Sequence, residues 1–220
     1  MTDKIRFTMI DNAQDSLSHA IELLAWKDIA SDASRLKQAI LSTAHAVELI
    51  LKERLSQTNP SLIWEDVDKY PRIDARTVGV DRAISRLRKI SGVSISPEDE
   101  QLITSLRNTR NAIEHFEWQT SHSEAKLIIG NAISFCLTFA QEHLKRDFAY
   151  SFKRDDTWMQ LISELTEFSR SHGERIQSKI QAQGVSVERC SYCSNQTVPI
   201  QGGACEVCGH WNDFANTIPI

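Results

Sequence analysis

The sequence is poor in the features that mark several common classes of protein. Its 220 residues carry 25 lysines and arginines against 29 aspartates and glutamates, a formal net charge of −4. This mixed charge excludes a histone-like or polybasic binder and restricts any nucleic-acid contact to a local surface. No apolar run approaches the ~18 residues of a membrane span. Residues 1–15 lack the apolar core of a secretion signal, so we expect a cytoplasmic protein.

Cysteine and proline are also scarce, and their positions are informative. Four of the five cysteines form two Cys-x-x-Cys pairs near the C-terminus, and the fifth, Cys136, stands alone in an apolar stretch. This distribution argues against a disulfide framework, and we expect Cys136 to be a small core residue. Residues 98–198 contain no proline. This stretch can therefore form uninterrupted helices and loops.

What is present predicts a mostly α-helical chain. Residues 32–56 place apolar side chains three and four positions apart, the period of an amphipathic helix. These side chains are Leu36, Ile40, Thr43, Val47, Ile50 and Leu51. Further helices are expected at residues 11–27, 81–91, 97–115, 123–148 and 156–183. Cap signals precede two of them, Ser96 with Pro97 and Ser121 with Glu124.

The expected fold class is all-α, with three parts along the chain. An antiparallel helical bundle covers residues 1–150, a helical extension or spacer covers 151–186, and a zinc ribbon covers 187–220. Residues 57–80 contain two prolines and read as an extended connection with one short helical turn. Gly130, inside a dense apolar helix, fits either a close helix contact or a tolerated glycine. Gly184 ends the last helix.

The end of the chain has the cysteine spacing of a metal site, two pairs separated by eleven residues at Cys190, Cys193, Cys205 and Cys208. A two-residue gap lets both sulfurs of a pair approach one ion, and four thiolates can surround one tetrahedral Zn²⁺. Gly209 relieves the backbone after the second pair, and Gly202 with Gly203 can turn the chain between two short strands. Residues 187–213 resemble a zinc ribbon, in which complete cysteine coordination implies a structural metal. A thioredoxin-like redox site would need a βαβ context that is absent.

The helix at 97–115 carries an unusual amount of polarity. Projected at about 100° per residue, one side holds the apolar residues that should face the core, namely Leu102, Leu106, Thr109, Ala112 and Ile113. The opposite side holds a polar stripe of Arg107, Arg110, Asn111, Glu114 and His115. By composition alone, this stripe also fits a solvated helix face on which Arg110 pairs with Glu114.

The order of Arg110, Asn111 and His115 on a bundle helix is similar to the signature of the HEPN family. That signature is an arginine followed by a polar residue, with a histidine after four to six residues. Residues 45–55, 77–90 and 105–116 resemble, in order, the glutamate–lysine helix, the connecting helix and the motif helix of the family. The resemblance covers about residues 11–148, and the zinc ribbon is an addition to the minimal family pattern.

The resemblance implies a metal-independent endoribonuclease that acts as a homodimer, with Arg110 and His115 from two copies in one cleft. The histidine would transfer a proton during attack by the RNA 2′-hydroxyl, and the arginine would stabilise the negative charge that develops on the phosphate. Asn111 would orient His115 or the phosphate, Glu114 would pair with Arg110, and Arg107 would be a secondary phosphate contact. The protein would then suit a toxin or a defence or stress effector, with a protein inhibitor as partner.

Other interpretations remain open at this stage. Arg82, Arg86 and Lys89 either extend an RNA track or form a solvated basic face. Some HEPN domains serve as binding or dimerisation modules, and the ribbon would then recruit a protein partner while the polar stripe binds a nucleotide or seals a dimer. A helical scaffold with an incidental motif is a third possibility.

Overall fold

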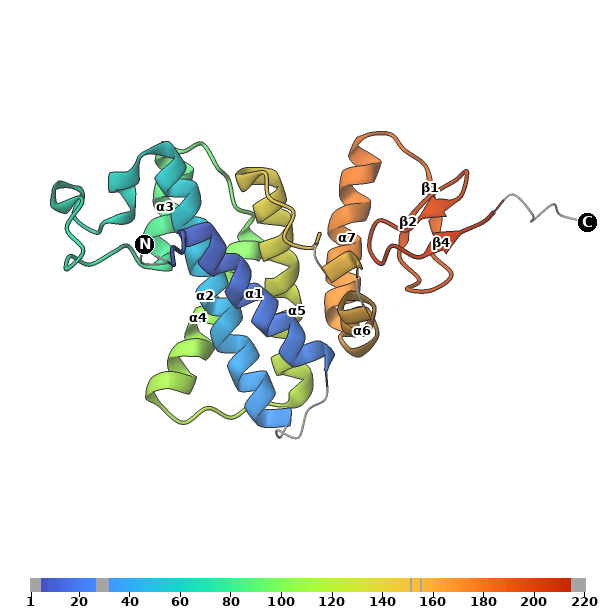
Figure 1. Cartoon of the computed structure of the whole chain (residues 1–220), viewed down its shortest axis with the longest axis horizontal. Helices are drawn as coiled ribbons and strands as arrows, with labels where there is room; N and C mark the ends of the chain where they lie inside the picture. Colours follow the sequence, from blue (N-terminus) through green and yellow to red (C-terminus); the bar gives the residue numbers. More distant parts are fainter. Residues whose placement is uncertain (1–4, 27–31, 151, 155, 215–220) are drawn as a thin grey trace, which may run out of the picture.

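The computed structural model describes residues 5–26, 32–150, 152–154 and 156–214, which are mostly helical (Figure 1). The α-helices are α1 (Met9–Ala25), α2 (Asp32–Thr58), α3 (Val80–Ile90), α4 (Pro97–His115), α5 (His122–Phe139), α6 (Asp156–Glu164) and α7 (Thr166–Ala182). Short 3-10 turns are η1 (Pro60–Ile63), η2 (Val67–Lys69) and η4 (Phe152–Arg154), and η3 (Ala140–Leu144) is a π turn. The strands are β1 (Val187–Arg189), β2 (Gln196–Pro199), β3 (Gly203–Ala204) and β4 (Trp211–Asn212). The mostly helical character is thus confirmed, and none of the described helices has the length and apolar content that a membrane span requires.

Helix α2 is the centre of the bundle and contacts α1, α3, α4 and α5 (Figure 1). Its predicted apolar stripe is confirmed, because all six of its side chains are buried. Thr43, the polar member of the stripe, donates its hydroxyl to the carbonyl of Ala39 at 2.7 Å. That bond satisfies the buried hydroxyl, so the stripe is removed from water without an unpaired polar group.

The predicted caps set the starts of two helices. The Ser96 hydroxyl accepts the amide of Asp99 at 3.1 Å at the start of α4, and Ser121 and Glu124 form a reciprocal capping box at the start of α5. Helix α1 begins at Met9, two residues earlier than predicted. An unrecognised capping box of Thr8 with Asp11 fixes this start. The predicted end of that helix, at residue 27, lies outside the described residues.

The buried side of α4 differs in part from the projection. Leu106 and Thr109 are buried as expected, but Leu102, Ala112 and Ile113 are only half-buried. Ile103 is 1 % exposed although the projection did not place it in the core. The reason is the position of α2 and α3, which flank α4 on the side that includes Ile103.

The C-terminal helices differ most from the sequence-based expectation. Helix α5 ends at Phe139 rather than near residue 148, and the π turn that follows it is capped by Lys145 in a left-handed conformation, φ 57°. The single helix expected at 156–183 is two helices, α6 and α7, separated at Leu165. This break lets α7 pack on α5. A Cβ atom on Gly130 would lie 2.8 Å from the backbone nitrogen of Phe168, so Gly130 marks a close helix contact.

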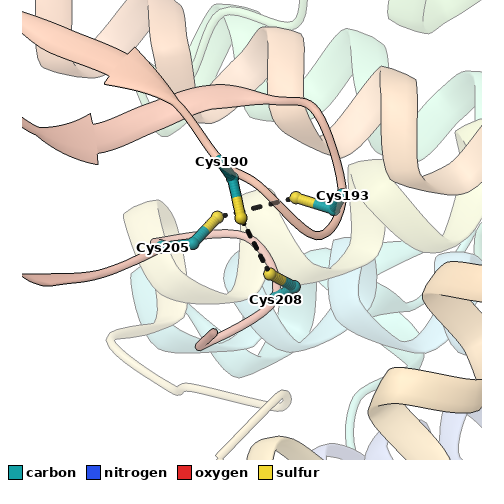
Figure 2. Close-up of side chains that lie close together, drawn as sticks. All are labelled: Cys190, Cys193, Cys205 and Cys208. Atoms are coloured by element: carbon teal, nitrogen blue, oxygen red, sulfur yellow. Dashed lines mark hydrogen bonds between the residues drawn. The ribbon is translucent and has the colours of Figure 1, made fainter. Parts of the chain in front are cut away.

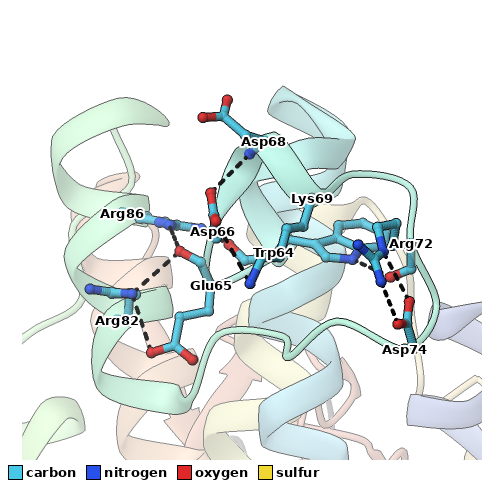
Figure 3. A network of polar contacts seen from close by, with 9 residues as sticks. All are labelled: Trp64, Glu65, Asp66, Asp68, Lys69, Arg72, Asp74, Arg82 and Arg86. Carbon is cyan, nitrogen blue, oxygen red and sulfur yellow. Dashed lines mark hydrogen bonds and ion pairs between the residues drawn. The ribbon is translucent and has the colours of Figure 1, made fainter.

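The connection between α2 and α3 is held in place by arginine. Arg86 donates to the carbonyls of Leu62 and Trp64, both at 2.5 Å. It also donates to the carbonyl of Glu65 at 2.9 Å (Figure 3). Trp64 also pairs with Thr77 in an isolated antiparallel bridge. The connection was expected to contain one helical turn but contains two, η1 and η2. The guanidinium of Arg86 holds this connection in a defined conformation, because it donates to backbone carbonyls that are not bonded within a regular helix or strand.

A buried histidine lies on α7. The ring of His172 stacks on Phe168 with centroids 5.2 Å apart and meets the edge of Trp158 at 6.0 Å. Its Nδ1 atom has no hydrogen-bond partner among the described residues. Burial, assisted by the nearby charges of Lys153 and Lys179, lowers the pKa of His172 to about 3. The imidazole is therefore neutral in the folded protein at ordinary pH.

We expect acid to destabilise the fold through His172. In the unfolded chain this histidine has the ordinary pKa of ~6.5 and binds a proton below that pH, whereas the buried ring in the folded protein stays neutral down to about pH 3. The free energy of unfolding therefore falls as pH drops from 6.5 toward 3. Between pH 7 and pH 5 this should cost about 2 kcal/mol. Urea unfolding of His172→Phe should lack this part of the pH dependence, whereas exposed His19→Phe should retain it. Equal slopes for the two variants would contradict the assignment.

Candidate functional site

Each cysteine pair closes on the same kind of turn. The amide of Ser194 donates to the carbonyl of Cys190 at 3.0 Å, and the amide of Gly209 donates to that of Cys205 at 2.8 Å. Ser194 and Gly209 both adopt left-handed conformations, with φ of 62° and 76°. Glycine adopts this conformation without steric strain, whereas in serine the Cβ atom comes close to the backbone and destabilises it. The two turns aim both sulfurs of each pair in one direction.

The two turns bring the four sulfurs together (Figure 2). All four Sγ atoms lie within 4.8 Å of one another, with 3.6 Å between Cys190 and Cys208 and between Cys193 and Cys205. These separations are too long for a disulfide bond of about 2.05 Å. A tetrahedral ion with metal–sulfur bonds of about 2.3 Å would place its ligands about 3.8 Å apart. The cluster therefore has the dimensions of a site for one metal ion.

Polar neighbours face the sulfurs. The side-chain amide of Asn195 donates to Cys193 Sγ at 3.4 Å, and that of Asn212 donates to Cys190 Sγ at 3.6 Å. The hydroxyl of Thr197 lies 3.2 Å from Cys205 Sγ. Such donors stabilise thiolates and orient them toward a metal. Sequence reasoning missed these three residues, although each lies within seven residues of a cysteine.

The neighbouring sulfurs affect one another's ionisation unequally, because hydrogen bonds from Cys193 and Cys208 lower the pKa of the Cys205 thiol. The Cys205 sulfur beside it raises the pKa of the Cys193 thiol to about 11, and partial burial adds to the increase. Four neighbouring thiolates repel one another unless a cation lies between them. Metal binding should therefore release protons, as expected for a thiolate site. Cys136 is separate from the cluster, and complete burial raises the pKa of its thiol, which makes it unreactive.

The cysteine module, residues 187–214, packs directly on the last helices. Strand β1 pairs with β2, and β3 pairs with β4, all antiparallel. The Trp158 indole on α6 donates to the Val207 carbonyl at 2.8 Å. On α7, a Cβ atom on Gly173 would come within 2.0 Å of Asn195 Oδ1. Helices α6 and α7, which lie in the segment expected to form a helical extension or spacer (151–186), thus lie between the bundle and the module (Figure 1).

The predicted polar stripe on α4 stays together, but its charges are paired. Arg110 Nε lies 2.8 Å from Glu114 Oε2, which is the pairing that the solvated-face interpretation required. The same carboxylate oxygen lies 4.0 Å from His115 Nε2. Asn111 accepts a long hydrogen bond of 3.4 Å from Arg110. Arg107 forms an ion pair with Asp81 on α3. The pairing of Arg110 with Glu114 was expected from their spacing, whereas the partner of Arg107 on α3 was not.

A groove between α2 and α4 borders this stripe. Its volume is about 260 Å³, and its floor is formed by apolar side chains of α2, α3 and α4. Its polar residues are His45 and Glu48 on α2 and Arg107, Arg110 and Glu114 on α4. Asn111 and His115 lie outside the groove lining, and the side chain of His115 is 65 % exposed. Three residues of the stripe therefore line the groove, whereas Asn111 and His115 lie outside it.

Glu48 and Lys52 form the polar part of α2 next to the groove. The buried ammonium of Lys52 lies 2.5 Å from Glu48 Oε1 and donates to the hydroxyl of Thr77 at 2.8 Å. A buried charge needs such partners. The pair anchors α2 to the connection before α3 rather than presenting a free cation to a ligand.

The three basic residues of α3 differ in their surroundings. Arg86 is committed to the carbonyls of the connection, and Arg82 pairs with Glu65 at 3.4 Å (Figure 3). Lys89 is exposed, and among the described residues no ion pair involves it. Arg86 has a structural role, so the expected basic track is reduced to Arg82 and Lys89.

Comparison of the chain with protein-family models, with curated proteins and with solved structures gives no match. Function has to be inferred from the cysteine cluster and from the polar side chains of α2 and α4.

We expect the purified protein to contain about one equivalent of a thiophilic metal ion, because four thiolates complete a tetrahedral shell. Changing Cys205 and Cys208 together to serine should abolish binding and unfold the last thirty or so residues, while far-ultraviolet circular dichroism retains the helical signal. Cys136→Ala is the matched control and should keep the metal. Elemental analysis that finds no metal in protein purified without chelator would contradict this prediction.

Proposed function

We propose that this protein is a metal-independent endoribonuclease of the HEPN type that carries a structural zinc ribbon. One observation carries the proposal: a single carboxylate, Glu114, lies between the guanidinium of Arg110 at 2.8 Å and the imidazole of His115 at 4.0 Å. The three side chains lie at the end of a helix, next to a groove with room for part of a ligand. The order of Arg110, Asn111 and His115, which resembles the HEPN signature, supports the same conclusion.

An imidazole and a guanidinium in this arrangement suit cleavage of RNA by its own 2′-hydroxyl. His115 transfers a proton at the attacking or the leaving oxygen, and Arg110 stabilises the charge that grows on the phosphate oxygens. Glu114 holds both groups until substrate displaces its contact with Arg110. Asn111 orients the phosphate or the imidazole. DNA lacks the attacking hydroxyl and is not a substrate.

A second copy of the chain completes the site in this proposal. Phe116 follows His115 at the end of α4, and the residue is 77 % exposed with its ring 6.4 Å from the imidazole. An exposed aromatic side chain beside polar groups is typical of a contact surface. A two-fold axis near this point would bring the ends of two α4 helices together and double the set of Arg110 and His115.

Zn²⁺ is the metal that we assign to the cysteine cluster. Four thiolates and tetrahedral dimensions suit zinc, and the complete shell leaves no position for a substrate or a water molecule. The ion then stabilises the small module. RNA cleavage itself requires no metal.

A non-catalytic binding module is the alternative function. The observation that favours it is the ion pair of Arg110 with Glu114, which neutralises the proposed phosphate contact in the monomer. Tyr192 and Trp211 are exposed on the cysteine module. In this alternative they recruit a protein partner, while the end of α4 binds a nucleotide or seals a dimer.

Light scattering at tens of micromolar should give twice the chain mass of 25.0 kDa. Phe116→Glu should convert this species to a monomer, because two carboxylates would meet at the proposed axis. The control is Ile73→Glu, which alters a 99 % exposed hydrophobic residue on the connection and should leave the mass unchanged. A wild-type mass of one chain, or equal behaviour of the two variants, would argue against the dimer.

RNA cleavage should require both Arg110 and His115. Alanine at either position should reduce the rate at least ~100-fold, the usual effect of removing an acid–base group or a charge-stabilising donor. Exposed Arg72→Ala, which loses only an ion pair with Asp74, serves as the control.

Three further measurements define the chemistry. Short treatment with chelator should leave the rate unchanged, RNA with 2′-O-methyl groups should resist, and the products should carry a 2′,3′-cyclic phosphate. Wild-type protein that binds RNA tightly but leaves it intact would favour the binding module instead.

A further inference from the structure

A second histidine faces the groove beside the proposed site. His45 on α2 lines the groove together with Arg110 and Glu114 of α4. Its Nδ1 atom lies 3.0 Å from the hydroxyl of Ser16 on α1. The imidazole of His45 therefore contacts α1 and shares the groove with side chains of α4, although residues 16, 45 and 110 are far apart in the sequence.

The contact with Ser16 suits a ring that must exchange a proton. A serine hydroxyl both donates and accepts, so it can satisfy Nδ1 in either neutral tautomer and also in the protonated ring. The position of the ring stays fixed while Nε2 gains or loses its proton. This arrangement of an imidazole with an orienting group is the one found around general acids and bases.

Charged groups of both signs line the groove that His45 faces, namely Glu48 on α2 and Arg107, Arg110 and Glu114 on α4. Glu48 lies one turn later on α2 and is paired with Lys52 at 2.5 Å. Across the groove, Arg110 and Glu114 pair with each other at 2.8 Å, and Glu114 also reaches His115 at 4.0 Å. Glu114 thus lies on the groove with His45 and also beside His115.

The groove has room for part of a nucleotide. An apolar cavity of roughly 150 Å³ holds one benzene molecule, and this groove measures about 260 Å³. Its floor is apolar, with Ala44, Val80 and Ile103 among the lining side chains. A single nucleobase can lie on this floor while its phosphate remains at the rim beside Arg110.

We propose that His45 is a second proton-transferring residue of the ribonuclease site, complementary to His115. This inference rests on the proposed function. The 2′-oxygen attacks phosphorus and forms the new P–O2′ bond while the P–O5′ bond breaks. One imidazole accepts the proton of the 2′-hydroxyl, and the other, entering as imidazolium, gives its proton to the departing 5′-oxygen. The products are a 2′,3′-cyclic phosphate and a 5′-hydroxyl, and solvent restores both rings.

The test compares His45→Ala with His115→Ala on an RNA dinucleotide over a range of pH. His45→Ala should lose at least ~100-fold in kcat. The bell-shaped pH dependence of the wild type should keep only one limb, and added imidazole should restore part of the rate. Ser16→Ala should lose less, because it removes only the orienting contact. His19→Ala is the matched control, an exposed histidine on α1 that lies outside the groove lining.

A modified substrate separates the two roles. When sulfur replaces the bridging 5′-oxygen, the leaving group departs without a proton, so the variant that lacks the general acid recovers. One of the two variants, His45→Ala or His115→Ala, should recover to within ~10-fold of wild type, and the other should not.

The outcomes distinguish this inference from the proposed function. Active wild-type protein whose His45→Ala variant keeps both the rate and the bell-shaped profile overturns the role of His45 alone. Wild-type protein that leaves RNA intact overturns both. Loss of rate in His45→Ala without rescue by imidazole and without a change of pH profile shows a structural effect and also overturns the assignment. Thermal unfolding of each variant confirms that the bundle is intact.

Discussion

The burial of α2 on several sides is the constraint on which the rest of the structure depends. Ile50, Leu51 and Leu55 are completely removed from solvent between the surrounding helices. Each such side chain contributes roughly 1.5–3 kcal/mol relative to an exposed position, and a gap at any of them would leave a cavity. The packing of α2 therefore fixes α1, α4 and α5 relative to one another. Where the neighbouring helices leave part of α2 uncovered, the groove is open, and His45 and Arg110 both line it.

The cysteine cluster is a second organising centre, and it is coupled to the helices. Asn195 donates to Cys193 Sγ at 3.4 Å and to the hydroxyl of Ser169 on α7 at 3.1 Å. Helix α7 in turn packs on α5 at Gly130. Asn195 therefore both contacts a cysteine sulfur and attaches the module to α7.

The parts of this protein that could be predicted are those encoded by neighbouring residues. The cap at Ser96 and the capping box at Ser121 act within one helical turn, so spacing alone reveals them. The cysteine pairs bring two sulfurs together within four residues each, which made a four-cysteine cluster predictable. The apolar period of α2 similarly identified its buried stripe. The polar stripe of α4 was visible for the same reason, although its pairing partners were only partly apparent.

What only the tertiary structure decided involves residues that are distant in the chain. The break at Leu165 has no side-chain cap to mark it in the sequence, and the partner of Gly130, Phe168, lies on another helix. The role of Arg86 in holding the connection depends on carbonyls more than twenty residues away. The groove itself needs side chains from α2, α3 and α4. The sequence by itself determined the mostly helical character, two of the caps and the four-cysteine cluster, because these depend on local spacing. The tertiary structure decided which polar groups face one another, because that depends on how the helices pack around α2.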